Sequence, residues 1–222
     1  ITFGGQASNG YAYSRANQIL NYNTKLFANY AKSFGNHNVD LTLGTEYQDS
    51  RTQNTDSEGQ QFPVDDLKTI ASAADITGGS SFLTEFTFVS YFTRVNYNFN
   101  RKYLLSFSGR VDGSSRFGTN NRYGFFPAAS LGWVLSEEEF LNSSNTLSFL
   151  KLRASYGLIG NAAIGNFEHL GLFGAEGYNG VSGLQPSQIP NPNLTWENTA
   201  QVDIGLDFGF LKDRINGEID YY

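Results

Sequence analysis

The stretch "GRVDGSSRFGTNNRYGFFPAASLGWVLSEEEFL" (residues 109–141) joins two amphipathic segments through a polar loop rich in Gly, Ser and Asn. In its second half, Ala129, Leu131 and Trp133 alternate with Ser130 and Gly132. Successive side chains of a β-strand point to opposite faces, so the pattern predicts a strand with one apolar face. The rest of the chain decides whether such a strand belongs to a soluble sheet or to a membrane.

The same alternation recurs along the chain and predicts about eight strands. They cover residues 20–30, 39–47, 89–99, 103–112, 129–136, 150–157, 200–208 and 215–222. Most of them exceed the length of about 5–6 residues that is usual in soluble sheets. They approach the roughly 9–11 residues that a tilted strand needs to cross a bilayer.

The composition fits a β-rich chain with many turns. Aromatic residues make up 15% of the 222 residues, and charged residues only 16%, against roughly 25% in an average soluble domain. The chain has 24 Gly and no Cys, which excludes a disulfide framework and a thiolate metal site. The net charge of −6 argues against a nucleic-acid partner, because phosphates need a basic surface.

The connections alternate between short and long. Short ones are expected at 35–38, 100–102 and 211–214, and long ones at about 50–85, 113–124 and 158–197. In outer-membrane barrels short turns are periplasmic and long loops extracellular. The sequence therefore predicts an all-β, antiparallel transmembrane β-barrel wall with three long extracellular loops.

In such a wall, alternate residues of each strand face the lipid, and the residues between them face the lumen. We expect one set of side chains to face lipid: Leu131, Trp133, Leu152, Val202, Ile204 and Leu206. The opposite parity carries charge, which lipid disfavours, and is expected in the lumen: Arg94, Arg110, Arg153, Asp203 and Asp207.

Other classes of protein remain open from the pattern alone. A soluble β-sandwich or glycan-binding β-domain also alternates. A complete eight-stranded outer-membrane barrel with an adhesion or structural role is the main alternative, and a barrel enzyme is another. The loop pattern places the start of the first strand and the end of the last strand at the extracellular rim, so we expect an open sheet rather than a closed barrel.

Several motifs in order carry a resemblance to a known family. The stretch "YFTRVNYNFNRKYLLSFSGRVDGSSRFGTNNRYGFFPAASLGWVLSEEEFL" (residues 91–141) is followed by "LKLRASYGLIGN" (150–161) and "NPNLTWENTAQVDIGLDFGFLKDRINGEIDYY" (191–222). Together they resemble the C-terminal barrel region of the SusC/RagA family of TonB-dependent outer-membrane transporters of Bacteroidetes. The resemblance implies that residues 1–222 are one partial domain of a larger barrel of about 22 strands, without its plug.

The resemblance also implies a function. The whole protein would import oligosaccharides or peptides across the outer membrane of a Gram-negative bacterium. Its partners would be a SusD-like surface lipoprotein and TonB, which acts through a plug region that these residues lack.

The sequence offers no catalytic, cofactor-binding or metal site. His37 and His169 are isolated, and the run Glu137–Glu139 is interpreted as a solvated turn, within a connection (136–148) that has room for a helical turn. The candidates for substrate binding are Tyr178, Trp196 and Arg116, although the favoured interpretation of Arg116 is that it fixes its loop to the wall. We expect cargo specificity to lie mainly in the loops at 50–85 and 158–197.

Overall fold

The computed structural model describes residues 9–64, 66–67, 69–141, 144 and 146–222. Its contacts divide the chain into two units, one within residues 1–22 and 49–86 and the other within 23–48 and 87–222. Strands dominate both units, and the only helices in the described ranges are short 3₁₀ turns. No helix among these residues is long and apolar enough to cross a membrane.

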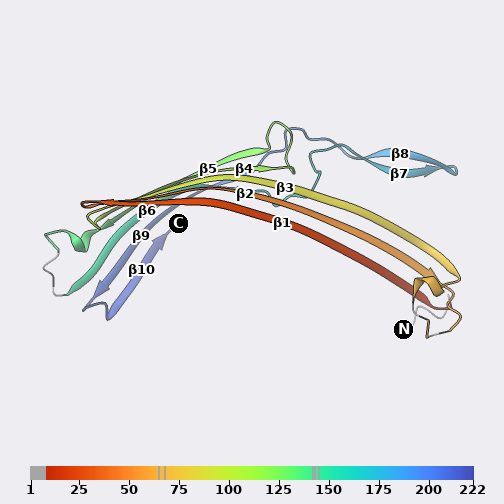
Figure 1. Ribbon diagram of the computed structural model, residues 1–222, viewed down its shortest axis with the longest axis horizontal. Coiled ribbons are helices and arrows are strands. Elements are labelled where there is room, and N and C mark those ends of the chain that lie inside the picture. The colour runs from red at the N-terminus through yellow and green to blue at the C-terminus, as the bar shows by residue number, and fades with distance from the viewer. Residues whose placement is uncertain (1–8, 65, 68, 142–143, 145) are drawn as a thin grey trace. The chain divides into compact units, whose positions relative to one another are not determined.

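Eight strands form the main sheet, in the order β1-β2-β3-β4-β5-β6-β9-β10 (Figure 1). They are β1 (Tyr11–Phe34), β2 (His37–Gln60), β3 (Asp75–Phe99), β4 (Tyr103–Ser114), β5 (Tyr123–Val134), β6 (Leu147–Asn161), β9 (Glu197–Phe210) and β10 (Ile215–Tyr221). The pairings from β3 to β10 are all antiparallel. The all-β antiparallel sheet is thus confirmed, and so is its open form, because β1 and β10 are its two edges.

The register of the second unit sorts the side chains onto two faces. Leu105, Leu131, Ala154 and Ile204 lie opposite one another in a row across β4, β5, β6 and β9. The adjacent row is Asn96, Ser106, Ser130, Ser155 and Asp203. Since neighbours along a strand point to opposite faces, one face is apolar and the other polar.

The expected division of side chains between these faces is confirmed. Trp133, Leu152 and Leu206 form a second row on the apolar face, and Val202 pairs there with Tyr156. The apolar face carries large exposed side chains, among them Phe107, Leu131, Leu152, Tyr156, Val202, Ile204 and Ile219. Arg94, Arg110, Arg153, Asp203 and Asp207 all have the polar-face parity.

The first unit corrects the loop expected at 50–85. Strand β2 continues to Gln60 and β3 starts at Asp75, so the connection is only 61–74, with a 3₁₀ turn at Ile70–Ser72. Asp56 accepts hydrogen bonds from Tyr13, Arg15 and Ser80 on the neighbouring strands. The end of β2, "RTQNTDSEGQ" (residues 51–60), is polar on both faces, so it lacks the alternation that marks a strand.

The other long connections are also shorter than expected. Strands β4 and β5 leave only 115–122, and β6 and β9 leave 162–196. The latter holds a separate hairpin, β7 (Leu172–Tyr178) and β8 (Val181–Gln188). Its turn is Asn179–Gly180, with φ of 50° and 78°, the positive angles of a type I′ turn.

The short turns lie where the sequence predicts them. They connect β1 to β2, β3 to β4 and β9 to β10. The backbone N–H of Asn100 donates to the carbonyl of Asn36, so the first two turns lie side by side. A 3₁₀ turn at Leu135–Glu137 opens the β5–β6 connection, as expected for its helical turn.

Candidate functional site

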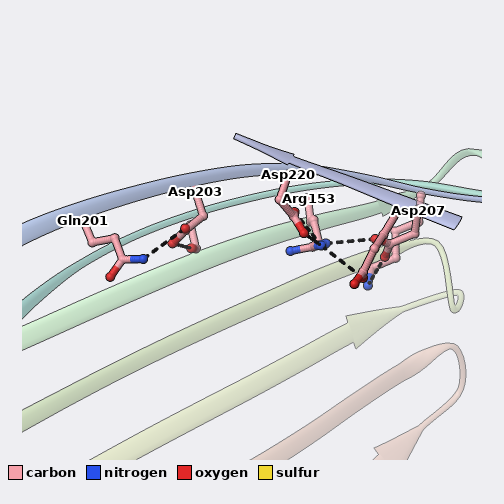
Figure 2. Close-up of polar contacts among 8 residues, drawn as sticks. Arg153, Gln201, Asp203, Asp207 and Asp220 are labelled. Atoms are coloured by element: carbon pink, nitrogen blue, oxygen red, sulfur yellow. Dashed lines mark hydrogen bonds and ion pairs between the residues drawn. The ribbon is translucent and has the colours of Figure 1, made fainter. Parts of the chain in front are cut away.

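A charged network crosses three strands of the polar face (Figure 2). Arg153 on β6 donates from Nε to Asp207 on β9 (3.0 Å) and from Nη2 to Asp220 on β10 (2.8 Å). Lys151 donates to the other oxygen of Asp207 (3.3 Å). Gly205 lies opposite both Arg153 and Asp220, and a Cβ there would overlap the guanidinium. The missing side chain therefore lets Arg153 reach across β9.

A shallow hollow of about 480 Å³ lies beside this network. Its lining includes the small polar side chains of Asn96, Ser106, Ser130 and Ser155, together with Asp203. Ser106 donates to Asn96, and Ser155 donates to Asp203. Gln201 also donates to Asp203 (Figure 2). Hydroxyls, amides and carboxylates arranged in this way can bind hydrated polar solutes.

A second charged network lies on β1, β2 and β4. Arg110 donates from Nε to Asp112 (2.6 Å) and from Nη2 to Ser90 (2.8 Å). Glu46 lies 3.5 Å from Arg110 and 3.4 Å from Lys25. Arg110 and Asp112 can pair because residues two apart on a strand share a face.

Arg116 ties two connections together. Its Nε donates to Asn166 (2.7 Å) and its Nη1 to the carbonyl of Ala162 (3.0 Å), while its own carbonyl contacts Nδ1 of His169 (3.2 Å). Desolvation by the surrounding loop lowers the pKa of Arg116 below its ordinary value, against the charge of Glu168, which raises it. These contacts favour the interpretation that Arg116 fixes its loop.

Trp196 is a packing residue in this structure. It is 7% exposed and forms a cluster with Phe117, which is 0% exposed, and Phe126. Its ring centroid lies 4.6 Å from that of Phe117 and 5.2 Å from that of Phe126, and Nε1 donates to the carbonyl of Arg122. This packing against phenylalanine rings does not favour substrate binding by Trp196, whose candidacy stays a prediction.

Tyr178 is separate from the other two candidates. It is 86% exposed and ends β7 at the Asn179–Gly180 turn, whereas Arg116 and Trp196 both hold the 115–122 connection. The structure thus does not gather the three into one binding site. Of these three candidates, Tyr178 has the side chain that is most open to a ligand.

Glu138 has a role that the sequence analysis missed. Its carboxylate accepts hydrogen bonds from Tyr103 (2.8 Å), Trp133 (3.1 Å) and Lys102 (3.1 Å). Hydrogen bonds from Tyr103, Trp133 and Lys102, in that order, lower the pKa of Glu138. Glu138 in the acidic run is therefore hydrogen-bonded and not merely solvated. The sequence signal that could have revealed this contact is Trp133, five residues before Glu138.

The two histidines lie apart from other possible metal ligands: the described part of the chain contains no cluster of three His, Asp or Glu side chains suited to a metal ion. His37 hydrogen-bonds Tyr97 (2.7 Å) and stacks on Phe34. His169 contacts the backbone of Arg116 instead. Both histidines therefore have structural contacts.

Comparison with known proteins places this sheet in a family. Residues 2–222 match the family described as "TonB dependent receptor-like, beta-barrel". TonB-dependent receptor P3 of Formosa agariphila is 36% identical over 225 residues, which cover 99% of this chain and 22% of that protein. TonB-dependent receptor SusC of Bacteroides thetaiotaomicron is 40% identical over 212 residues, covering 91% and 20% respectively.

Solved structures of transporters of this kind have the same fold as this chain. The RagAB peptide transporter matches with a TM-score of 0.89 at 30% identity, over 95% of this chain and 24% of that one. The RagAB peptide importer in its "closed-closed" state matches with a TM-score of 0.88. The chain spans about a fifth of the curated relatives it matches. The chain therefore belongs to the TonB-dependent receptor-like β-barrel family, in its SusC/RagA group.

Proposed function

We propose that this chain forms part of the wall of an outer-membrane transporter that imports oligosaccharides or peptides with energy delivered through TonB. The observation that carries the proposal is the division of one sheet into an apolar and a charged face. In this role the apolar face meets lipid, and the polar face lines a lumen wide enough for a plug and a cargo.

Peptide is the cargo that the comparisons favour, since the matching RagAB structures are titled as a peptide importer and transporter. A SusD-like surface lipoprotein would deliver the cargo at the loop end of the wall, where the exposed Tyr178 lies in the β7–β8 hairpin. The plug and the TonB contact would come from other parts of the full polypeptide. A catalytic role has no support in the described side chains.

The alternative of a small closed barrel is not favoured. A closed eight-stranded barrel pairs its first strand with its last, whereas β1 and β10 are edges here. Unpaired edges of this length are expected to pair with further strands, because open edges are not tolerated in lipid.

The test is uptake by cells that express the full polypeptide or lack it. Fluorescent peptides and neutral oligosaccharides are offered with and without a protonophore, and with the neighbouring surface lipoprotein present or deleted. The proposal expects accumulation that needs the polypeptide, the lipoprotein and an energised inner membrane. Accumulation that is unchanged by the protonophore would contradict transport through TonB.

A further inference from the structure

A second hollow on the polar face, of about 380 Å³, has an excess of positive charge. Lys25 of β1, Arg94 of β3 and Arg110 of β4 contribute to its lining. Phe92 contributes an aromatic surface and lies opposite Arg110, whose guanidinium carbon is 5.7 Å from the ring centroid. All of these residues belong to the second unit of the chain.

The carboxylates around this hollow do not reach Arg94. Glu46 is shared by Lys25 (3.4 Å) and Arg110 (3.5 Å), and Asp112 is paired with Arg110 (2.6 Å). Of the three cations that line the hollow, Arg94 is therefore the one without an acidic partner among the described residues. Asp40 lines the neighbouring hollow with Asn96, yet no ion pair joins it to Arg94 in the described part of the chain.

Arg94 differs from the other arginines of this face. Arg110 and Arg153 each contact two acidic side chains or more. Arg94 is exposed on the face opposite the apolar rows, and no hydrogen bond or ion pair engages its side chain within the described ranges. An unpaired guanidinium presents several donors in one plane, which match the two oxygens of a carboxylate.

We propose that Arg94, with the positive field of Lys25 and Arg110, binds a carboxylate of a peptide cargo. The proposal rests on the function proposed above and specifies its cargo as acidic peptide. A carboxylate of the cargo would give Arg94 the acidic partner that Lys25 and Arg110 already have. Phe92 would contact the apolar stem of the same residue. A charge in a lumen enclosed by lipid is screened less than one in open water, which strengthens the pairing.

The test measures binding of two peptides to the purified full polypeptide. One is a fluorescent hexapeptide with two glutamates, and the other carries glutamine at both positions; both have amidated ends. The wild type is expected to bind the acidic peptide about ten-fold more tightly, and added salt should reduce this preference. Arg94→Gln should bring the ratio near one and leave the affinity for the glutamine peptide unchanged.

Arg101→Gln is the matched control, since it removes the same charge from an exposed turn outside the hollow. It should keep the ten-fold preference. Arg94→Glu serves as a second variant and should favour the glutamine peptide. A normal preference in Arg94→Gln, or failure of both Arg94 variants to assemble while Arg101→Gln assembles, would overturn the proposal.

Two outcomes distinguish a failure of the carboxylate site at Arg94 from a failure of peptide import. If the wild type imports both peptides and binds them equally, the carboxylate site is wrong and peptide import stands. If it imports neither, peptide import fails and the carboxylate site fails with it. Trigalacturonate is a third probe: binding that depends on Arg94, without binding of the acidic peptide, would overturn the assignment to peptide.

Discussion

Arg153 on β6 and Asp220 on β10 are joined by a 2.8 Å hydrogen bond that passes over the intervening strand β9. The bond is possible because the residue between them is Gly205. A glycine in mid-strand lowers the stability of the strand itself, so its presence here reflects the close approach of the guanidinium. The charged side chains of three strands thereby form one layer on the polar face.

Gly205→Val is expected to displace Arg153 and weaken the attachment of the edge strand β10. Overpacking of this kind costs about 1–3 kcal/mol. The measurement is the thermal midpoint of the purified full polypeptide. Gly177→Val is the control, because a Cβ at Gly177 meets nothing within 4 Å. Equal midpoints for the two variants would show that Gly205 is not required for space.

Ile204→Arg is expected to impair assembly into the outer membrane. An arginine on the lipid side at the membrane midplane costs about 2–4 kcal/mol. The control is Gln201→Arg, which places the same side chain on the polar face of the same strand. The amount of heat-modifiable protein in isolated outer membranes reports assembly. A defect of similar size in both variants would contradict the assignment of the two faces.

Phe117→Ala is expected to destabilise the contact between the connections 115–122 and 162–196. Phe117 is 0% exposed and packs on Trp196, and such truncations cost about 3–5 kcal/mol. Limited proteolysis should cut the 162–196 connection faster than in the wild type. Phe140→Ala removes a ring that is 68% exposed and should leave the cutting rate unchanged. An unchanged rate in Phe117→Ala would mean that the cluster does not hold the connections.

Glu138 should make stability depend on pH. Its pKa is lowered in the folded state, so its contribution is fully present above the ordinary carboxyl pKa of 4.5 and is lost as the pH falls through the folded value. The difference in thermal midpoint between wild type and Glu138→Gln should therefore be constant from pH 7 to about pH 5 and shrink below pH 4.5.

The neighbouring exposed side chain provides the control for this pH series. Glu137→Gln removes the same charge from a side chain outside the contacts with Tyr103 and Trp133. Its midpoint should track the wild type at every pH. A difference for Glu138→Gln that persists undiminished to pH 3 would contradict the role of the carboxylate.

The sequence predicts those strands whose two faces meet different surroundings. Leu131 and Ser130 are distinguishable because one parity is apolar and the other polar, and the register confirms both. The outer part of β2 (residues 51–60) lacks this contrast, so the segment around Asp56 resembles a loop in the sequence. Its strand structure depends on pairing with neighbours, which local composition does not encode.

The candidate site was only partly predictable for a related reason. The Asn-Gly pair at 179–180 is a hairpin signal in the sequence, and the hairpin lies within the stretch expected as a long loop. The burial of Trp196 depends on Phe117, and the hydrogen bonds to Glu138 depend on residues such as Tyr103. Both partners are distant in sequence. Whether Arg94 has an acidic partner depends on which carboxylates lie near it. The register of strand pairing determines those neighbours, and it cannot be read from local sequence.

The central claim is that one face of this sheet meets lipid and the other an aqueous lumen. Residues 1–222 contain no cysteine, so single cysteines can be placed at Ser130 and Leu131 in a cysteine-free full polypeptide. Both native side chains are exposed in the structure, and they differ in face. In intact outer membranes a small charged thiol reagent should label Ser130→Cys and spare Leu131→Cys, while detergent-denatured protein is labelled at both. Labelling of Leu131→Cys and not of Ser130→Cys in the membrane would contradict the account.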